Sequence, residues 1–534
     1  MKIKEKKETL NFFKKPSKDF LPKVLSDIFV KDKTFIYTLI TTLATCFICY
    51  FYEMIHGLGC PDTLCEGLRT YRNADFSTSQ ARWMLRFINE FFGKNVIIPT
   101  VTVISYCLMI GVSAFIICRM MRINKASYVV IITATMVSFP IILHQFAYLY
   151  MALAYSFSFL MVVCASYLTR THKIIFFAVS IIFHLMMMGS YQSYIGAATA
   201  LAIVMFIFDL IDTDSIKKAF INLGLAAASL AGGALINMPF SRFMMNHYHT
   251  GMDERVSAFS IAPIFENLGF SLKFSYVWFF SYFNNEILSR NRFYFILFLA
   301  LILLAISIIV GKILKKQYGV AALILLGFLL LPIGMNFLLV LMPSNGMRDI
   351  LRYQYVLIFP LLIMLHDKLD GLLYTSILKV LSHAAIAFIL IANVISANST
   401  ALMYKYSYED AINQANFMMN KVYDLEDYVA NETPIILTGP ISYSALQDKY
   451  PKIFRYAEVE GGPVFWNDFY GMNICRYQFF QDFIGVNPQY ITREDFSVVD
   501  SEEFKEMPVW PLTGSVKMID GKVVIKTSDN PPEY

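Results

Sequence analysis

Two carboxylates lie close together in a polar segment that follows the first apolar run of the sequence. Asp62 and Glu66 are four residues apart in HGLGCPDTLCEGL, so on a helical turn they share one face. A carboxylate held near cations can act as a general base and take the proton of an attacking hydroxyl. Most carboxylates in loops are simply solvated charges, but Asp62 follows Pro61, lies just beyond an apolar run and is in an arginine-rich segment. Asp62 and Glu66 are therefore the candidate catalytic residues.

Arginines form the second set of candidate site residues. Arg82 follows in SQARW, and Arg348 and Arg352 are spaced i and i+4 in SNGMRDILRYQY, where an apolar run begins. The planar guanidinium group matches phosphate oxygens, so these three residues are candidates for binding a lipid phosphate. Contact with ordinary headgroups or with partner carboxylates is the alternative. Tyr191 and Gln192, in a short turn between two apolar runs, are candidates for lining an acceptor cleft.

The remaining reactive residues indicate neither a metal nor a cofactor. Cys60 and Cys65 lie in the same polar segment and are candidates for a disulfide, because we place that segment in an oxidising compartment. No pair of His or Cys at ligand spacing accompanies them, so we expect no metal site. The nucleotide, metalloprotease and serine-hydrolase motifs are absent, and we expect no cofactor. No basic patch interleaved with aromatics suggests nucleic acid as a partner.

The composition requires that membrane helices position these residues. The sequence is 57% hydrophobic and only 16% charged, with a mean hydropathy of +0.52, which a water-soluble fold of 534 residues does not have. About 20 apolar residues are needed to cross the bilayer core as a helix. We predict about eleven such spans, near residues 35–54, 96–117, 127–143, 150–169, 174–190, 194–211, 219–237, 293–311, 319–342, 353–369 and 377–397.

The distribution of Lys and Arg orients the spans. Every second connection is basic, while the short connections 144–149 and 191–193 carry no Lys or Arg. The positive-inside rule then places the basic connections in the cytoplasm. The outer connections are 55–95, with the candidate carboxylates, 238–292 and 343–352. An apolar stretch at 262–286 is interpreted as interfacial or re-entrant, because counting it as a span would reverse this bias.

The two ends of the chain differ in character. Residues 1–34 are rich in Lys, and we predict a cytoplasmic segment with a helix lying on the inner membrane surface. After residue 398 the composition becomes polar. PIILTG is typical of a strand, and SVKMIDGKVVIKT predicts a hairpin that turns at Asp520-Gly521. The expected fold is an all-α polytopic membrane domain at 35–397, followed by a small extracytoplasmic α/β domain at 398–534.

Several short motifs together resemble one family. They are PDxxCEGL in the first outer segment, STSQARW some residues later, YQS after a mid-chain span, and PxWPxxGSV followed by IDGKVVIK near the end. The chain is similar in these motifs and in its topology to bacterial O-antigen glucosyltransferases of type II. The family pattern has Gly before the Arg-Trp pair, whereas this chain has Ala81, which affects the backbone geometry before Arg82.

The resemblance implies a glycosyltransferase of the type C fold in the bacterial plasma membrane. Such an enzyme takes a hexose, often glucose, from a polyprenyl-phosphate carrier and attaches it to a surface glycan outside the cytoplasm. Its acidic residue in the first outer loop corresponds to Asp62 or Glu66 here. The carrier, the glycan and membrane lipids are then the expected partners.

Three other functions are compatible with a membrane protein that has outer arginines. A flippase or transporter of lipid-linked sugars should show broken helices and polar residues at mid-membrane, which are sparse in this sequence. A surface polysaccharide polymerase or ligase would use a diphosphate-linked donor. A structural protein that binds glycan through its C-terminal domain would leave the acidic first loop without a purpose.

Overall fold

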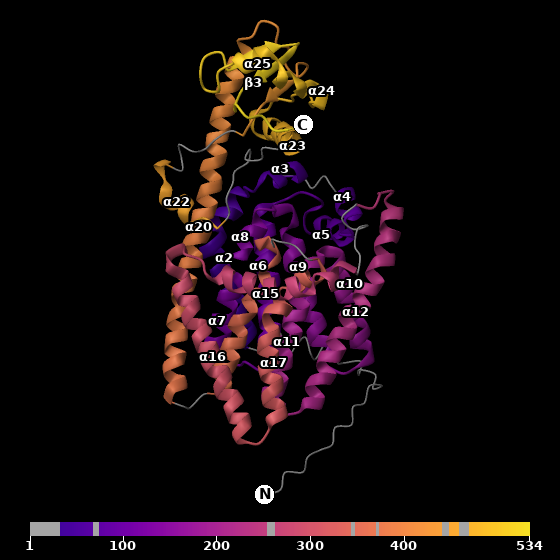
Figure 1. Cartoon of the computed structure of the whole chain (residues 1–534), viewed down its shortest axis with the longest axis vertical. Helices are drawn as coiled ribbons and strands as arrows, with labels where there is room; N and C mark the ends of the chain where they lie inside the picture. The colour runs from indigo at the N-terminus through magenta and orange to yellow at the C-terminus, as the bar shows by residue number, and fades with distance from the viewer. Residues whose placement is uncertain are drawn as a thin grey trace.

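The computed structural model shows a bundle of long helices with a smaller unit at one end (Figure 1). The structure describes residues 33–67, 74–253, 262–342, 348–369, 373–440, 448–458 and 469–533. The surface helix predicted within residues 1–34 lies almost entirely outside these ranges. We call the end of the bundle next to the C-terminal unit the upper end, as it is drawn in Figure 1, and the opposite end the lower end.

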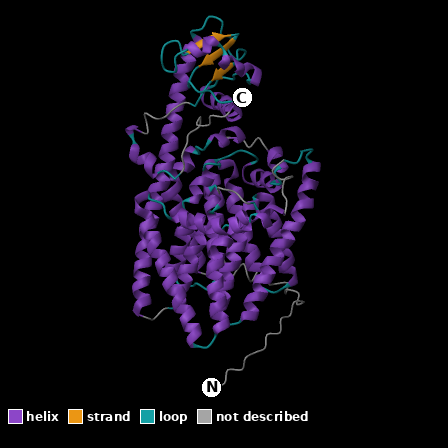
Figure 2. Cartoon of the chain, viewed as in Figure 1, coloured by secondary structure: helices purple, strands orange, loops and turns teal. Residues whose placement is uncertain are grey.

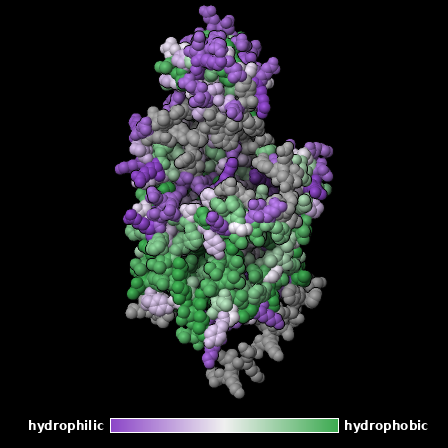
Figure 3. Space-filling view, viewed as in Figure 1, coloured by the Kyte–Doolittle hydropathy of each residue, from purple (hydrophilic) through white to green (hydrophobic). Residues whose placement is uncertain are grey.

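The described residues contain eight helices that are long and apolar enough to cross a membrane. They are α2 (Lys33–His56), α6 (Pro99–Met120), α9 (Leu149–Thr169), α11 (Ile195–Thr213), α12 (Ile216–His247), α16 (Arg290–Leu314), α17 (Tyr318–Met335) and α20 (Leu373–Tyr423). Figure 3 shows hydrophobic residues over the sides of this bundle and hydrophilic residues on the C-terminal unit. The prediction of an all-α polytopic membrane protein is therefore confirmed.

The predicted number of eleven spans is not confirmed. Two of the predicted runs form shorter helices, namely α7 (Ala126–Val137) and α19 (Ile358–Lys368), because the chain turns within the run. Helix α10 (Ile174–Ser190) covers its predicted run 174–190 in full, but its 17 residues are fewer than those of the eight spans above. The stretch at 262–286 forms α14 (Ala262–Glu266) and α15 (Leu268–Phe283), and α15 packs against α17 and α18 (Phe337–Leu341).

Two helices run past their predicted ends. Helix α12 continues ten residues beyond 237 and takes up the beginning of the predicted outer loop. Helix α20 spans 51 residues and joins the bundle to the C-terminal unit without a break (Figure 1). A helix satisfies its backbone hydrogen bonds internally, so polar side chains allow it to continue beyond the apolar layer. The change in composition at residue 398 therefore does not mark the end of a helix.

Ion pairs bring the basic connections together at the lower end. Asp212, at the end of α11, pairs with Arg122 and Lys368 from two other connections, at 2.9 and 2.6 Å. Lys312 and Asp214 form a similar pair between α16 and the connection after α11. The connections that the sequence assigns to one side of the membrane thus meet at one end of the bundle.

The C-terminal unit contains a three-stranded sheet with the order β1-β3-β2 (Figure 2). β1 (Ile435–Leu437) pairs in parallel with β3 (Lys522–Ile525), which pairs antiparallel with β2 (Val516–Ile519). The predicted hairpin is confirmed, with Asp520 and Gly521 both at positive φ. The other helices of the chain are α3 (Pro61–Gly67), α4 (Ala74–Ser79), α5 (Trp83–Gly93), α8 (Ile141–Phe146), α22 (Pro451–Tyr456), α23 (Phe469–Phe479), α24 (Arg493–Phe496) and α25 (Glu502–Glu506).

A buried ion pair ties the C-terminal unit to the bundle. Arg290, at the start of α16, pairs with Glu458, and its side chain is only 2% exposed. Arg290 also donates to Asn393 Oδ1 of α20 at 3.0 Å, and Ser396 Oγ donates to the same Glu458 carboxylate at 3.0 Å. These bonds satisfy both charges in a desolvated place, where an unpaired charge would be very costly. The upper part of α20 is thereby fixed against α16.

The contact between α2 and α6 provides a test of the packing. A Cβ on Gly111 would lie 2.2 Å from Thr42 Oγ1, so Gly111→Ala should destabilise the protein by about 1–3 kcal/mol. Gly311→Ala is the matched control, because a Cβ there meets nothing within 4 Å. The midpoint of thermal unfolding in detergent measures both. Equal midpoints for the two variants would contradict the packing described here.

Candidate active site

The turn between α8 and α9 anchors the first upper connection. The carbonyl of Ala147 accepts hydrogen bonds from the backbone N–H of Cys60 at 3.0 Å and from Thr63 Oγ1 at 2.6 Å. A Cβ on Gly59 would lie 2.6 Å from the same carbonyl, so only glycine allows this approach. Tyr408 of α20 donates to Gly59 O at 3.0 Å. The chain therefore enters α3, with Asp62 in its first turn, from a fixed position.

Asp62 is within electrostatic reach of Tyr148, the residue that precedes α9. Burial raises the pKa of Tyr148 well above its usual value, the charge of Asp62 raises it further, and the charge of Arg348 opposes the rise. The phenol is thus neutral, and both a carboxylate and a guanidinium group act on it. Asp62 and Arg348 are therefore both within electrostatic reach of Tyr148, although 286 residues separate them in the sequence.

Arg82 reaches the same cluster from the side. Its guanidinium carbon lies 4.8 Å from the centre of the Tyr191 ring, which is a cation–π distance. The Tyr191 ring in turn lies 4.8 Å from that of Tyr155, edge to face. Tyr155 is within electrostatic reach of both Arg82 and Tyr148. Tyr191 and Tyr155 are thus in ring contact, and electrostatic influence extends from them to Tyr148 and so to Asp62 and Arg348.

Gln192 shapes the turn that carries Arg82. Its side-chain amide donates to the carbonyls of Gln80 and Ala81, both at 3.1 Å. Ala81 has φ +61°, in the left-handed region that favours glycine. The Gly that the family pattern has before Arg-Trp would adopt this conformation without strain. Gln192, which we predicted to line a cleft, thus holds the backbone before Arg82.

Arg348 and Arg352 differ in their surroundings. Arg348 is exposed, whereas Arg352 is 4% exposed, forms an ion pair with Asp349 at 2.6 Å and lies 4.8 Å from the Trp278 ring centre. Residues 349–351 between them form a 3₁₀ turn, so the two arginines do not lie on one face of an α-helix. Arg348 is free to turn towards a ligand, and Arg352 stabilises the segment that carries it.

His144 of α8 adds a titratable group to the upper end. Its Nε2 lies 3.8 Å from Asp349 Oδ2. Burial lowers the pKa of His144 below the usual 6.5; Asp349 and Glu458 oppose this shift, and Arg352 and Arg290 reinforce it. The imidazole is therefore neutral at neutral pH and can accept a proton or a hydrogen bond.

The predicted disulfide between Cys60 and Cys65 is wrong. Cys60 is a free cysteine, and burial raises the pKa of its thiol to about 12. Cys475 of α23 is disulfide-bonded and lies against Pro61, with its sulfur 3.3 Å from the Pro61 carbonyl oxygen. The sequence could not indicate that Cys475 lies at Pro61, because α23 is distant from α3 in the chain and packs onto it only in the tertiary structure. Glu66 lies on α3 as predicted, but its side chain is outside the described residues.

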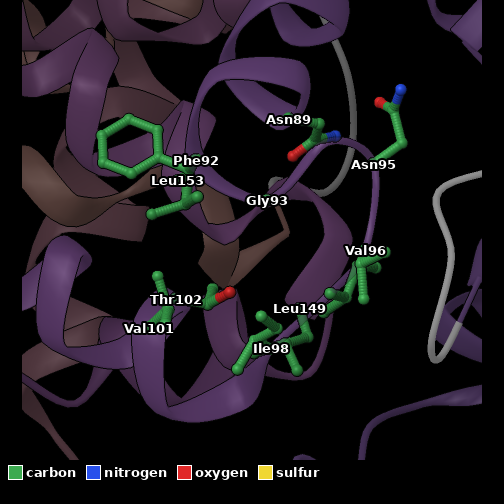
Figure 4. Close-up of a pocket in the computed structure, with 11 residues that line it drawn as sticks. Asn89, Phe92, Gly93, Asn95, Val96, Ile98, Val101, Thr102, Leu149 and Leu153 are labelled. Atoms are coloured by element: carbon green, nitrogen blue, oxygen red, sulfur yellow. The ribbon is translucent and has the colours of Figure 1, made fainter.

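A hollow near the upper end is too small for a substrate. Figure 4 shows a hollow between the end of α5 and the starts of α6 and α9, lined by Asn89, Gly93 and Thr102 among others. Its volume of about 10 Å³ is far below that of a sugar. Within the described ranges, no three His, Cys, Asp or Glu side chains are grouped to hold a metal ion.

Fold and site define a polytopic α-helical membrane protein with an acid, arginines and tyrosines gathered at one end of its bundle. The glucosyl transferase GtrII family model matches residues 67–365, more than half of the chain, and the chain belongs to this family. It is therefore a glucosyltransferase. No curated protein and no solved structure matched the chain. Asp62 and Glu66 precede the matched residues, whereas all three candidate arginines lie within them.

Sequence analysis missed several residues of this cluster. Tyr148 and Tyr155 lie in AYLYMALAY, a stretch in which no site residue was predicted. Asp349 lies between the two predicted arginines but was given no role. A row of tyrosines directly after a span end, opposite an acidic loop, is a signal that could have indicated the cluster. Trp278 carries no such signal, because only the packing of α15 brings it under Arg352.

Replacing Gln192 tests the positioning of Arg82. Gln192→Leu keeps the shape of the side chain but leaves two carbonyls unbonded, which should cost about 1–3 kcal/mol of stability. Because the turn then carries Arg82 less firmly, we expect the KM for the sugar donor to rise more than kcat falls. Steady-state glucosyl transfer measures both. Gln489→Leu, in the C-terminal unit, is the control, and an unchanged KM in Gln192→Leu would contradict the positioning role.

The buried imidazole of His144 predicts a pH dependence of stability. The pKa of His144 is lower in the folded protein than in the unfolded chain, where it is near 6.5. At a pH between these two values, His144 binds a proton in the unfolded chain but not in the folded protein. The free energy of unfolding should therefore decrease as pH falls through this range. His144→Asn should flatten that decrease, as measured by thermal unfolding from pH 7.5 to about 5. His247→Asn, at the exposed end of α12, should keep the wild-type slope; a wild-type slope in His144→Asn would refute the assignment.

Proposed function

We propose that this glucosyltransferase takes its hexose, glucose, from a polyprenyl-phosphate carrier and transfers it to a cell-surface glycan at the extracytoplasmic face of the bacterial plasma membrane. The observation that carries the proposal is the grouping of Asp62, Arg348 and Arg82 around Tyr148, Tyr155 and Tyr191. One acid and two cations at the upper end of a membrane bundle suit a hydroxyl acceptor and a lipid-borne phosphate donor.

In the proposed reaction Asp62 is the general base. The carboxylate takes the proton of the acceptor hydroxyl, whose oxygen forms a bond to the anomeric carbon of the donor sugar. The bond between that carbon and the phosphate oxygen breaks, and its electron pair leaves with the polyprenyl phosphate. The transition state resembles an oxocarbenium ion. Since the leaving phosphate needs no proton, cations suffice to stabilise its charge.

Arg348 and Arg82 are the proposed phosphate-binding residues. Arg348 is exposed, and Arg82 is held by Tyr191 and by the turn that Gln192 supports. Arg352 has a different proposed role, because it is buried and paired with Asp349. We assign to it the positioning of Arg348. Tyr191 contributes the ring under Arg82, and the neutral hydroxyl of Tyr148 lies within electrostatic reach of Asp62.

Charge distribution supports the proposed orientation. The basic connections meet at the lower end, and the positive-inside rule assigns such an end to the cytoplasm. The upper end, with Asp62 and the C-terminal unit, then lies outside. No nucleotide-binding motif is present in the sequence, so an activated sugar on a lipid phosphate is the donor that such an enzyme can reach. The C-terminal unit is proposed to be extracytoplasmic and to face the glycan.

Substitution of Asp62 tests the reaction. Purified protein is given a polyprenyl-phosphate glucose and candidate acceptor glycan, and transfer is measured for wild type, Asp62→Asn and Glu66→Gln. Loss of the base should lower kcat of Asp62→Asn by about 10²–10⁴-fold, with the thermal midpoint kept. Asp75→Asn is the control, since Asp75 is an acid of the same connection that pairs with Arg86.

Three results would contradict the proposal. Full activity in Asp62→Asn together with loss of activity in Glu66→Gln would show that Glu66, and not Asp62, is the general base. Transfer from a diphosphate-linked donor alone would indicate a polymerase or ligase. No transfer from any monophosphate-linked sugar, together with movement of the carrier across vesicles, would indicate a flippase.

A further inference from the structure

A lateral groove lies within the apolar part of the bundle, away from the proposed reaction centre. It has a volume of about 270 Å³ and is lined mainly by α11, α12 and α17. Helix α11 packs against both other helices and forms the floor of the groove. Ala227 of α12 and Leu330 of α17 are exposed at its margins. The groove therefore opens to the side of the bundle, where the surface is hydrophobic (Figure 3).

The lining of the groove is mostly apolar. Small residues at Ala198, Ala202 and Ala226 leave the space free, and larger aliphatic side chains close its edges. His184 lines the groove, and its Nδ1 is hydrogen-bonded to Ser229 Oγ at 2.9 Å. Ser229 Oγ is in turn hydrogen-bonded to Ser180 Oγ at 2.7 Å. A hydrocarbon chain would thus contact mainly apolar side chains there.

The upper end of the groove continues into the segment that carries the arginines. Gly334 of α17 lines the groove and accepts a hydrogen bond from Thr199 of α11 at 2.7 Å. The next residue, Met335, accepts a bond from the Gln354 side chain at 2.6 Å. Gln354 follows Arg352 by two residues, in the 3₁₀ segment Tyr353–Leu357. One chain of contacts therefore leads from the groove to the proposed phosphate-binding residues.

We infer that the groove binds the isoprenoid chain of the lipid carrier, an inference that rests on the proposed function. A donor whose phosphate lies at Arg348 must place its chain in the apolar layer below. The groove is a cavity in that layer with room for a branched hydrocarbon, and it begins under the same segment. Chain binding there would fix the orientation of the phosphate and hence of the anomeric carbon relative to Asp62.

A pair of neighbouring alanines on α12 allows a matched test. Ala227 lines the groove, whereas Ala228 is also exposed but does not line it. Ala227→Trp fills the groove and Ala228→Trp adds the same bulk to the surface beside it. Transfer is measured with two donors, a polyprenyl-phosphate glucose of natural length and geranyl-phosphate glucose, whose chain is much shorter. The ratio of kcat/KM for the long donor to that for the short donor reports chain binding.

Ala227→Trp should lower that ratio by about 10-fold, and Ala228→Trp should leave it within about 2-fold of wild type. An unchanged ratio in Ala227→Trp would overturn the inference, and an equal fall in both variants would indicate a general effect of bulk in the lipid layer. A separate measurement keeps the two proposals apart. A polyprenyl phosphate with a photoreactive group on its chain should label α11, α12 or α17 of the wild type, and excess unlabelled polyprenyl phosphate should prevent this labelling. If excess phospholipid prevents the labelling equally well, the groove binds ordinary acyl chains and the inference is overturned.

If the protein transfers glucose from none of the polyprenyl-phosphate sugars, the proposed donor is refuted. Specific labelling of the groove would still hold in that case, so failure of the donor and failure of the groove can be told apart.

Discussion

The carbonyl oxygen of Ala147 is the point on which the candidate site depends. It accepts two hydrogen bonds from the first upper connection, one from a backbone N–H and one from the Thr63 hydroxyl. A carbonyl at the end of a short helix has no partner within the helix, and in a place closed to water it needs one. The connection supplies both bonds, and in doing so it brings Asp62 within electrostatic reach of Tyr148. The acid is therefore positioned by backbone groups of the bundle itself.

The C-terminal unit completes this arrangement from above. Helix α23 lies on α3, with Cys475 against Pro61, and Tyr408 of the long helix α20 bonds to Gly59. The buried pair of Arg290 and Glu458 fixes α20 against the bundle. Because α20 is continuous from its lower end to the C-terminal unit, movement of that unit and movement of the acidic connection are mechanically linked. The unit thus supports the site in addition to any contact it makes with the glycan.

Two arginines that look equivalent in the sequence have separate surroundings in the structure. Arg352 is buried over Trp278 and paired with Asp349, while Arg348 is exposed. Burying a guanidinium group costs several kcal/mol unless a carboxylate and hydrogen bonds compensate. Asp349 provides this compensation for Arg352. The same carboxylate faces His144, so the charge state of the upper end depends on a small set of coupled groups.

The sequence by itself determined the class of the fold, the approximate places of the apolar runs, the hairpin at Asp520-Gly521 and the acidic and basic residues to consider. These follow from composition, periodicity and turn chemistry, which are local properties of the chain. Only the tertiary structure decided that Gln192 supports the turn at Ala81, that Cys60 is free, and that Tyr148 and Tyr155 join residues hundreds of positions apart. It also decided where helices α7, α12 and α20 begin and end. These features arise from contacts between helices that are distant in the sequence, and hydropathy does not record which helices will be neighbours.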